Sequence, residues 1–86
     1  MTPERNQNIP ESDLIVGCLA GNRRMQEELY RRFSPRMYAV CLRYVGNAEE
    51  AEDILQEGFI KVFKKLDSFR SEGSFEGWVR RIFVNT

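Results

Sequence analysis

Residues 47–69, NAEEAEDILQEGFIKVFKKLDSF, decide how this chain folds. Apolar residues recur along this stretch at steps of three and four, which is the spacing of one face of an α-helix. Asn47, just before the run, has a side chain that can accept a hydrogen bond from an amide of the first helical turn. The stretch therefore predicts an amphipathic helix that starts after Asn47 and packs its apolar side into a core. That side consists of Ala48, Ala51, Leu55, Val62 and Leu66, with Ile54, Phe59 and Phe63 beside it.

The polar side of this helix is divided by charge. Residues 47–57 contain five acidic side chains and no basic one, whereas three lysines follow within residues 58–65. Acid near the N-terminus and base near the C-terminus suit the helix dipole. Asp53, Gln56 and Glu57 are spaced at i, i+3 and i+4, so they share one exposed face. On charge alone, such a face is more often a solvated surface than a binding surface.

Start and stop signals predict two helices before this stretch. Ser12 is the expected cap of a short helix over residues 13–20, and Gly21 ends it because glycine readily adopts the left-handed conformation that closes a helix. Asn22 caps the next helix, which is expected to stop at the glycine before Asn47. Within it, Ser34-Pro35 predicts a kink or a break, because proline lacks an amide hydrogen and crowds the preceding turn.

Length and composition favour one small helical domain. The chain has 86 residues, near the lower limit for a self-sufficient core. The expected fold class is all-α, a compact bundle of about four helices over residues 12–86. Residues 1–11 are polar and contain two prolines, so they are expected to be a disordered leader.

Several classes of protein are disfavoured by what the chain lacks. It has no histidine and only two cysteines, Cys18 and Cys41, so neither a zinc site of usual ligand count nor a disulfide framework is expected. Both cysteines lie in apolar helical patterns and are interpreted as small buried hydrophobes. No metal or cofactor is therefore expected. There is no signal peptide and no apolar run long enough to enter a membrane, which predicts a cytoplasmic protein.

The net charge is zero, from 13 basic and 13 acidic residues. A nucleic-acid-binding domain is usually basic, so the total argues mildly against DNA binding. The charges are segregated along the chain, however, and separate faces can therefore serve different partners.

The last helix carries residue types that suit single-stranded nucleic acid. Ser74 is its expected cap, and Trp78, Arg81 and Asn85 follow at helical spacing. Asparagine can bind a base edge, arginine can hold phosphate, and a flipped base needs a pocket with an aromatic wall. The alternative is an ordinary turn with Phe69 and Trp78 in the core, and for Trp78 the core is the more common outcome. The expected inward stripe is Trp78, Ile82 and either Phe75 or Val79.

A family resemblance changes these odds. Residues 53–86, DILQEGFIKVFKKLDSFRSEGSFEGWVRRIFVNT, closely resemble the second conserved region of bacterial RNA polymerase sigma factors, specifically the extracytoplasmic-function (ECF) class of the sigma-70 family. The resemblance extends back through LYRRFSPRMYAVCLRYVGNAEEAED and LIVGCLAGN, and so covers about residues 12–86. It implies a transcription initiation factor that binds core RNA polymerase and recognises and melts the promoter −10 element as single-stranded DNA.

The resemblance also assigns roles to individual residues. The surface for the coiled-coil clamp helices of the polymerase β′ subunit matches Asp53, Gln56, Glu57 and Ile60. The elements that capture the −10 strand match Ser68, Phe69, Arg70, Ser71, Ser74, Trp78, Arg81 and Asn85. Glu72 and Glu76 depart from a DNA-binding pattern, because carboxylates beside this loop would repel phosphate.

Three other classes remain to be weighed. Clustered carboxylates could serve an enzyme only if burial separated their pKa values, and here they lie on a polar helix face, so no catalytic residue is expected. A helical adaptor could use the acidic face for a protein partner without touching DNA. A reader of double-stranded DNA would need a free basic recognition helix, and the apolar stripe of the last helix argues against one.

The resemblance finally bears on the extent of the chain and its partners. It implies a second, C-terminal helical domain, called region 4, which is absent from these 86 residues. The apolar end of the last helix would then be a truncated surface, which predicts self-association in isolation. An anti-sigma factor is a common partner in the family, but no residue here identifies one. Neither the promoter sequence nor the inducing signal can be read from the chain.

Overall fold

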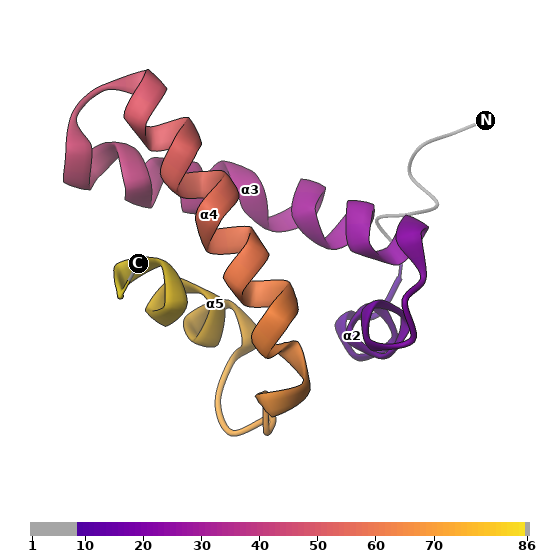
Figure 1. Cartoon of the computed structure of the whole chain (residues 1–86). Coiled ribbons are helices and arrows are strands. Elements are labelled where there is room, and N and C mark those ends of the chain that lie inside the picture. Colours follow the sequence, from indigo (N-terminus) through magenta and orange to yellow (C-terminus); the bar gives the residue numbers. More distant parts are fainter. Residues whose placement is uncertain (1–8, 86) are drawn as a thin grey trace. The chain divides into compact units, whose positions relative to one another are not determined.

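The computed structural model describes residues 9–85, and residues 1–8 of the predicted leader lie outside the described residues. Within this range the chain forms helices and no strand (Figure 1). They are α2 (Glu11–Leu19), α3 (Arg23–Val45), α4 (Ala48–Lys65), the short 3-10 helix η1 (Leu66–Ser68) and α5 (Phe75–Val84). The all-α class with four α-helices is thus confirmed. Contacts within the chain divide it into two units, one ending at Arg32 and one beginning at Phe33.

In the first unit, α2 begins earlier than the sequence predicts. Its N-cap is Pro10 rather than Ser12, and no side chain caps it. The Pro10 carbonyl accepts the first helical hydrogen bond, from the Leu14 amide at 3.0 Å. Proline has a fixed φ that suits entry into a helix, so the start does not require a serine cap. Glu11, assigned to the leader from the sequence, therefore belongs to α2.

The end of α2 and the start of α3 confirm the sequence signals. Gly21 has a φ of +83°. The Gly21 amide donates to Cys18 O at 3.0 Å and the Asn22 amide to Gly17 O at 2.9 Å, which is the paired closure of a Schellman motif. Asn22 Oδ1 in turn accepts from the Met25 amide at 3.2 Å, so Asn22 caps α3 as expected.

The sequence predicts a kink or a break at Pro35, and the structure shows no break: α3 is one helix from Arg23 to Val45 with Pro35 inside it. Proline in a helix interior costs about 3 kcal/mol, since a hydrogen bond is lost and the preceding turn is crowded. Phe33 and Met37, on either side of Pro35, are buried. Burial of these two side chains offsets the local cost, which a reading of the sequence alone overestimates.

The core of the second unit lies where α4 and α5 meet. Most of the predicted stripe of α4 is buried, but Ala48 is exposed because it opens the helix. The buried residues of α5 are Phe75, Val79 and Phe83, so the predicted stripe is wrong in placing Trp78 and Ile82, which are half-buried, at its centre.

Close approach of α4 and α5 depends on Gly58. A Cβ atom on this residue would lie 2.3 Å from Cε2 of Phe83, a distance that no real contact allows. The Phe83 ring fills that space and packs edge-on against Phe59, with ring centroids 5.2 Å apart. Asn47 and Ser74 cap the two helices as predicted, each accepting a backbone amide at 2.9 Å. These features fix the C-terminal half of α4 against α5.

Candidate functional site

A pocket of about 240 Å³ lies where the C-terminal half of α4, η1 and α5 meet. Its lining comprises three basic residues, two residues with small polar or amide side chains, one aromatic residue and one aliphatic residue. These are Lys61, Lys65, Ser68, Trp78, Arg81, Ile82 and Asn85. The structure thus brings together four of the eight residues predicted to bind the −10 element, namely Ser68, Trp78, Arg81 and Asn85.

Trp78 forms the aromatic wall of this pocket. Its ring stacks on Phe75 at a centroid distance of 5.7 Å and an angle of 24°. Phe69 packs on the same indole at 5.3 Å. Trp78 is half-buried, so one part of the ring belongs to an aromatic cluster while another part lines the pocket. The two interpretations of Trp78, core and base-stacking wall, are therefore compatible with each other.

Sequence reasoning missed Lys61 and Lys65 as part of the site. Both are exposed and line the pocket from α4. Their i, i+4 spacing places them on one face, and Ser68 follows three residues later, which is the available signal. The two lysines and Arg81 give the pocket three cations, and no acidic residue lines it. Such a pocket attracts a phosphate group and offers the indole to a base.

The other four predicted DNA-binding residues lie outside the pocket lining. Phe69 is half-buried and packs edge-on against Phe75 at 5.1 Å, so it supports Trp78 from behind. The Ser74 hydroxyl accepts a hydrogen bond from the Gly77 amide and thereby caps α5. Arg70 and Ser71 are exposed in the loop, where Ser71 has a φ of +61°.

Of the two glutamates that depart from a DNA-binding pattern, Glu72 and Glu76, one is neutralised by an ion pair. Glu76 forms an ion pair with Arg36, with Oε1 and Nη1 2.6 Å apart. This contact joins α5 to α3 within the second unit, and it directs the carboxylate to a guanidinium. Glu72 remains exposed in the loop.

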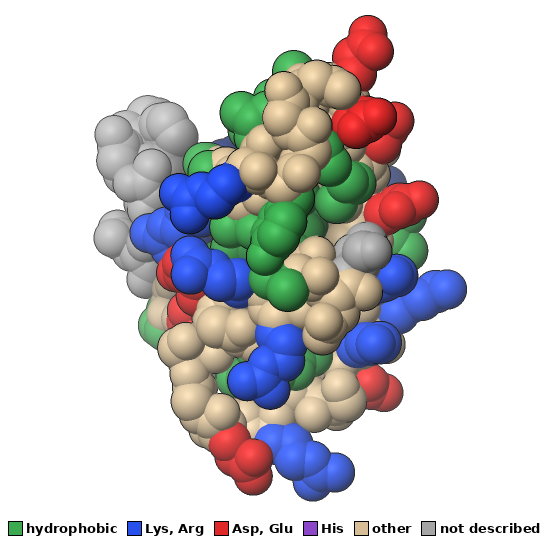
Figure 2. Space-filling model, turned by 90° about the vertical axis from the view of Figure 1, so that its left-hand side faces the viewer, with side chains coloured by type: hydrophobic (Ala, Val, Ile, Leu, Met, Phe, Trp, Pro, Cys, Tyr) green, Lys and Arg blue, Asp and Glu red, His purple; other side chains and the backbone are tan. Residues whose placement is uncertain are grey.

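The acidic face occupies a different part of α4. Asp53, Gln56 and Glu57 are exposed, and Ile60 is 57% exposed. Within residues 9–85, neither Asp53 nor Glu57 has a basic group within ion-pair distance. On the side of the molecule in Figure 2, a group of acidic side chains lies at the upper right, and basic side chains border hydrophobic ones lower down. The predicted polymerase-binding residues thus form one accessible surface, called the acidic face below.

Over residues 9–85 there is no cluster of three or more His, Cys, Asp or Glu side chains that could hold a metal ion. Burial raises the pKa of Cys18 to about 11 and also raises the pKa of Cys41. Both thiols are buried and protonated near neutral pH, as their interpretation as small hydrophobes predicts.

Among residues 9–85, no helix has the length and apolar character needed to cross a bilayer.

Comparison with known proteins identifies relatives along the whole chain. The family description "Sigma-70 region 2" matches residues 29–86. The chain is 31% identical over its full length to the RNA polymerase sigma-H factor of Pseudomonas aeruginosa, of which it covers 42%. It is 42% identical over 59 residues, 69% of the chain, to the ECF sigma factor SigE of Mycolicibacterium smegmatis, of which it covers 23%.

A further relative is the ECF sigma factor SigW of Bacillus subtilis, which is 42% identical over 53 residues, 62% of the chain and 28% of the relative. The chain thus spans less than half the length of these curated relatives. No solved structure gave a significant match. The family match covers residues 29–86 and one relative is similar over the whole chain, so the chain belongs to the sigma-70 family as a region 2 domain of the ECF class.

Proposed function

We propose that this chain is the part of a transcription initiation factor that binds core RNA polymerase and captures the promoter −10 element as single-stranded DNA. The observation that carries the proposal is the pocket between α4 and α5, which combines three cations, an indole and an asparagine. Similarity to RNA polymerase sigma factors supports promoter DNA as the ligand in this proposal. A cytoplasmic location follows from this role.

The pocket residues make different contacts with single-stranded DNA in this proposal. Lys61, Lys65 and Arg81 attract the phosphate backbone, which supplies most of the affinity and makes it fall with added salt. Trp78 offers a face for stacking, and Asn85 can donate to and accept from the edge of an unpaired base. Trapping an unstacked base offsets the few kcal/mol that unpairing costs, so a strand can be held open without ATP.

The acidic face supplies the polymerase contact in this proposal. Successive helix residues are rotated by about 100°, so Asp53 and Gln56 are directed away from Lys65, while Glu57 lies one turn before Lys61 at the boundary between the acidic face and the lysines. The basic clamp helices of the β′ subunit would meet carboxylates that have no competing ion pair in the described chain. Complementary charge steers and orients such an encounter, while exposed Ile60 adds apolar contact.

The single tryptophan of the chain makes the DNA contact measurable. Titration with a mixed-sequence single-stranded oligonucleotide should quench Trp78 fluorescence, and the same sequence as a duplex should bind more weakly. Arg81→Ala and Asn85→Ala should each weaken binding about tenfold, in line with about 1–3 kcal/mol for a specific base contact. Arg24→Ala, at the start of α3, is the control and should bind as the unchanged chain does.

Two outcomes would overturn the DNA part of the proposal. One is fluorescence that does not respond to the oligonucleotide, and the other is equal affinity of all three variants. A folded chain that still bound the β′ clamp helices would then be an adaptor that uses the acidic face alone.

A further inference from the structure

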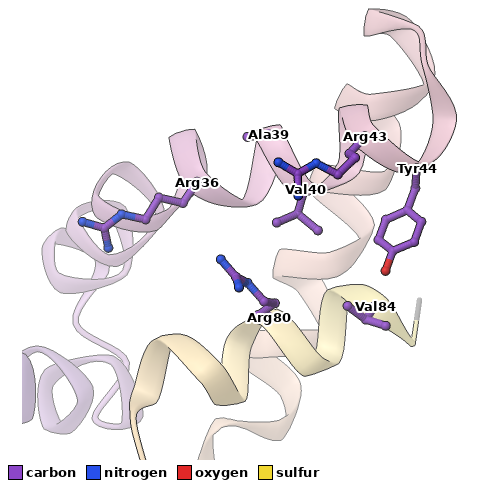
Figure 3. Close-up of a pocket in the computed structure, with 7 residues that line it drawn as sticks. All are labelled: Arg36, Ala39, Val40, Arg43, Tyr44, Arg80 and Val84. Atoms are coloured by element: carbon purple, nitrogen blue, oxygen red, sulfur yellow. The ribbon is translucent and has the colours of Figure 1, made fainter.

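A second cavity, of about 380 Å³, lies between the C-terminal half of α3 and α5 within the second unit (Figure 3). Three arginines and four apolar or aromatic residues line it, and no acidic residue does. They are Arg36, Ala39, Val40, Arg43, Tyr44, Arg80 and Val84. This cavity is called the arginine groove below.

The side chains of the groove converge from two helices. Val40 and Tyr44 project from α3 toward α5, and Arg80 projects from α5 toward α3 (Figure 3). Tyr44 is 67% exposed and Val84 is 49% exposed, which are high values for large apolar side chains. The groove therefore leaves apolar surface in water where Tyr44 and Val84 lie at one end (Figure 3), and covering it would be favourable.

The charge of the groove is only partly compensated. Arg36 is held by Glu76 at 2.6 Å at one end. Elsewhere in residues 9–85, no carboxylate lies within ion-pair distance of Arg43 or Arg80. Each of these two guanidiniums can bind a carboxylate by donating two parallel hydrogen bonds to it, which is the geometry that arginine favours.

The arginine groove is separate from the pocket that contains Trp78. Given the rotation of about 100° per residue, Arg80 and Val84 lie on one flank of the buried stripe of α5, and Trp78 and Asn85 lie on the other. No residue lines both cavities. One ligand bound at the Trp78 pocket therefore does not account for the groove.

We propose that the arginine groove binds an acidic, amphipathic segment of a partner protein. Carboxylates of the segment pair with Arg43 and Arg80, and an apolar side chain between them packs on Val40, Tyr44 and Val84. Tyrosine and arginine are the residue types that dominate the energetics of protein interfaces. The partner surface is independent of the polymerase and −10 contacts proposed above.

Nucleic acid fits the groove less well than such a segment does. Sites for single strands combine cations with aromatic platforms on which successive bases stack. Here the apolar lining of the groove is largely aliphatic, with Ala39, Val40 and Val84, and offers one aromatic ring. An aliphatic lining beside two arginines matches an apolar side chain flanked by carboxylates.

The test uses the 86-residue chain, labelled with nitrogen-15, and three probes. The first is a peptide of about 15 residues, near the length at which an isolated helix is marginal, with leucines on one face and glutamates beside them. The second has glutamine in place of each glutamate, and the third is an oligothymidylate of similar length. We expect the glutamate peptide to shift the amide signals of Val40, Tyr44 and Val84 and to leave those of Trp78 and Asn85 unchanged.

Charge reversal provides the matched comparison. Arg43→Glu with Arg80→Glu should weaken binding of the glutamate peptide at least about tenfold, because close charge pairs become repulsive. Arg23→Glu with Arg24→Glu changes the net charge equally and should leave binding unchanged. If the reversed variant does not fold by circular dichroism, Arg43→Ala with Arg80→Ala replaces it and should still weaken binding.

Three results would overturn the proposal. They are no shift in the groove with the glutamate peptide, equal binding of the glutamine peptide, and equal binding by the arginine variants. A preference of the groove residues for oligothymidylate would also overturn it and would make the groove a phosphate-binding surface. None of these results bears on the Trp78 pocket, so the proposed function is tested separately.

Discussion

The two halves of α4 present opposite charges and are built differently. The acidic face, which begins in the first half, consists of side chains from one helix, and they are all exposed. The lysines of the second half share a pocket with η1 and α5, and that pocket exists only while α5 is packed on α4. The difference teaches that a face on one helix depends on local structure, whereas a pocket between helices depends on the core. Changes that loosen α5 should therefore impair DNA binding before they impair polymerase binding.

The largest effect on the pocket, relative to the acidic face, is expected from removal of the Phe75 ring. Its side chain is 2% exposed and lies within 5.4 Å of the Phe33 ring and 5.1 Å of the Phe69 ring, measured between centroids. Phe75→Ala should lower the free energy of unfolding by about 3–5 kcal/mol, the usual cost of deleting a buried aromatic ring. Urea denaturation followed by circular dichroism measures the loss. A loss no greater than that of Phe63→Ala, at a half-buried position, would contradict the assigned core.

A smaller change tests the close approach of α4 and α5. Gly58→Ala places a methyl group against the buried ring of Phe83, which already packs on Phe59 and cannot easily move. Gly17→Ala crowds Cγ and Cβ of Met25, at 2.4 and 3.0 Å, so it is the matched control for similar crowding away from α4 and α5. Gly58→Ala should lower the free energy of unfolding by about 1–3 kcal/mol, the usual cost of overpacking.

The same pair of variants also separates the two surfaces. Gly58→Ala should weaken binding of single-stranded DNA more than binding of the β′ clamp helices, since only the pocket needs α5 in place. An unchanged stability of the Gly58 variant, or its equal loss of both binding activities, would argue against a pocket that depends on helix packing.

The N-caps of α4 and α5 allow the helix of the acidic face and the helix of the pocket to be destabilised separately. Asn47 Oδ1 caps the acidic end of α4, and Ser74 Oγ caps α5, the helix that carries Trp78, Arg81 and Asn85. Replacement of either residue by alanine should cost about 1 kcal/mol. Asn47→Ala should mainly affect binding of the clamp helices, and Ser74→Ala should mainly affect DNA binding. Thermal unfolding and the two titrations, done on the same samples, measure both effects, and identical effects of the two variants would contradict the division.

The smallest effect concerns thiols that belong to neither surface. Burial raises the pKa of Cys18 from an ordinary 9.0 to about 11 in the folded chain. An unfolded thiol loses its proton first as the pH rises, so this group favours folding below about pH 9 and that contribution is lost between about pH 9 and 11. Cys18→Ala should flatten the decline of stability over this window. An unchanged decline, or rapid iodoacetamide labelling of the folded chain at pH 8, would contradict burial of the thiol.

Local features of the fold were predictable from the sequence, and tertiary ones were less so. The caps at Asn22, Asn47 and Ser74 follow from residue type and spacing, and they are present. Of the kink or break expected at Pro35, a break does not occur, and Phe33 and Met37 on either side of the proline are buried. Local signals can thus locate the ends of helices, whereas a proline in a helix interior has to be judged together with the packing around it.

The site was predictable to the extent that it lies on one helix. Trp78, Arg81 and Asn85 share a face of α5, so their spacing brings them together. Lys61 and Lys65 were missed because nothing in the local sequence tells which side of α4 faces α5. Phe83 was missed as core for the same reason, since the apolar stripe of α5 can be drawn through Trp78 or through Val79 and Phe83.

The central claim is that the acidic face binds the polymerase and the pocket at the other half of α4 does not. The most direct measurement is binding of the 86-residue chain to an isolated β′ clamp coiled coil by calorimetry. The comparison is between Asp53→Lys with Glu57→Lys and a control, Glu11→Lys with Asp13→Lys, which makes the same change in net charge on α2. Circular dichroism would establish that both variants fold.

We expect the unchanged chain and the α2 control to bind the coiled coil at about micromolar concentration, near −8 kcal/mol. The Asp53 and Glu57 variant should bind at least about tenfold more weakly and should retain its affinity for single-stranded DNA. Equal binding of the two folded variants, or no binding by the unchanged chain, would contradict the assignment of the acidic face to the polymerase.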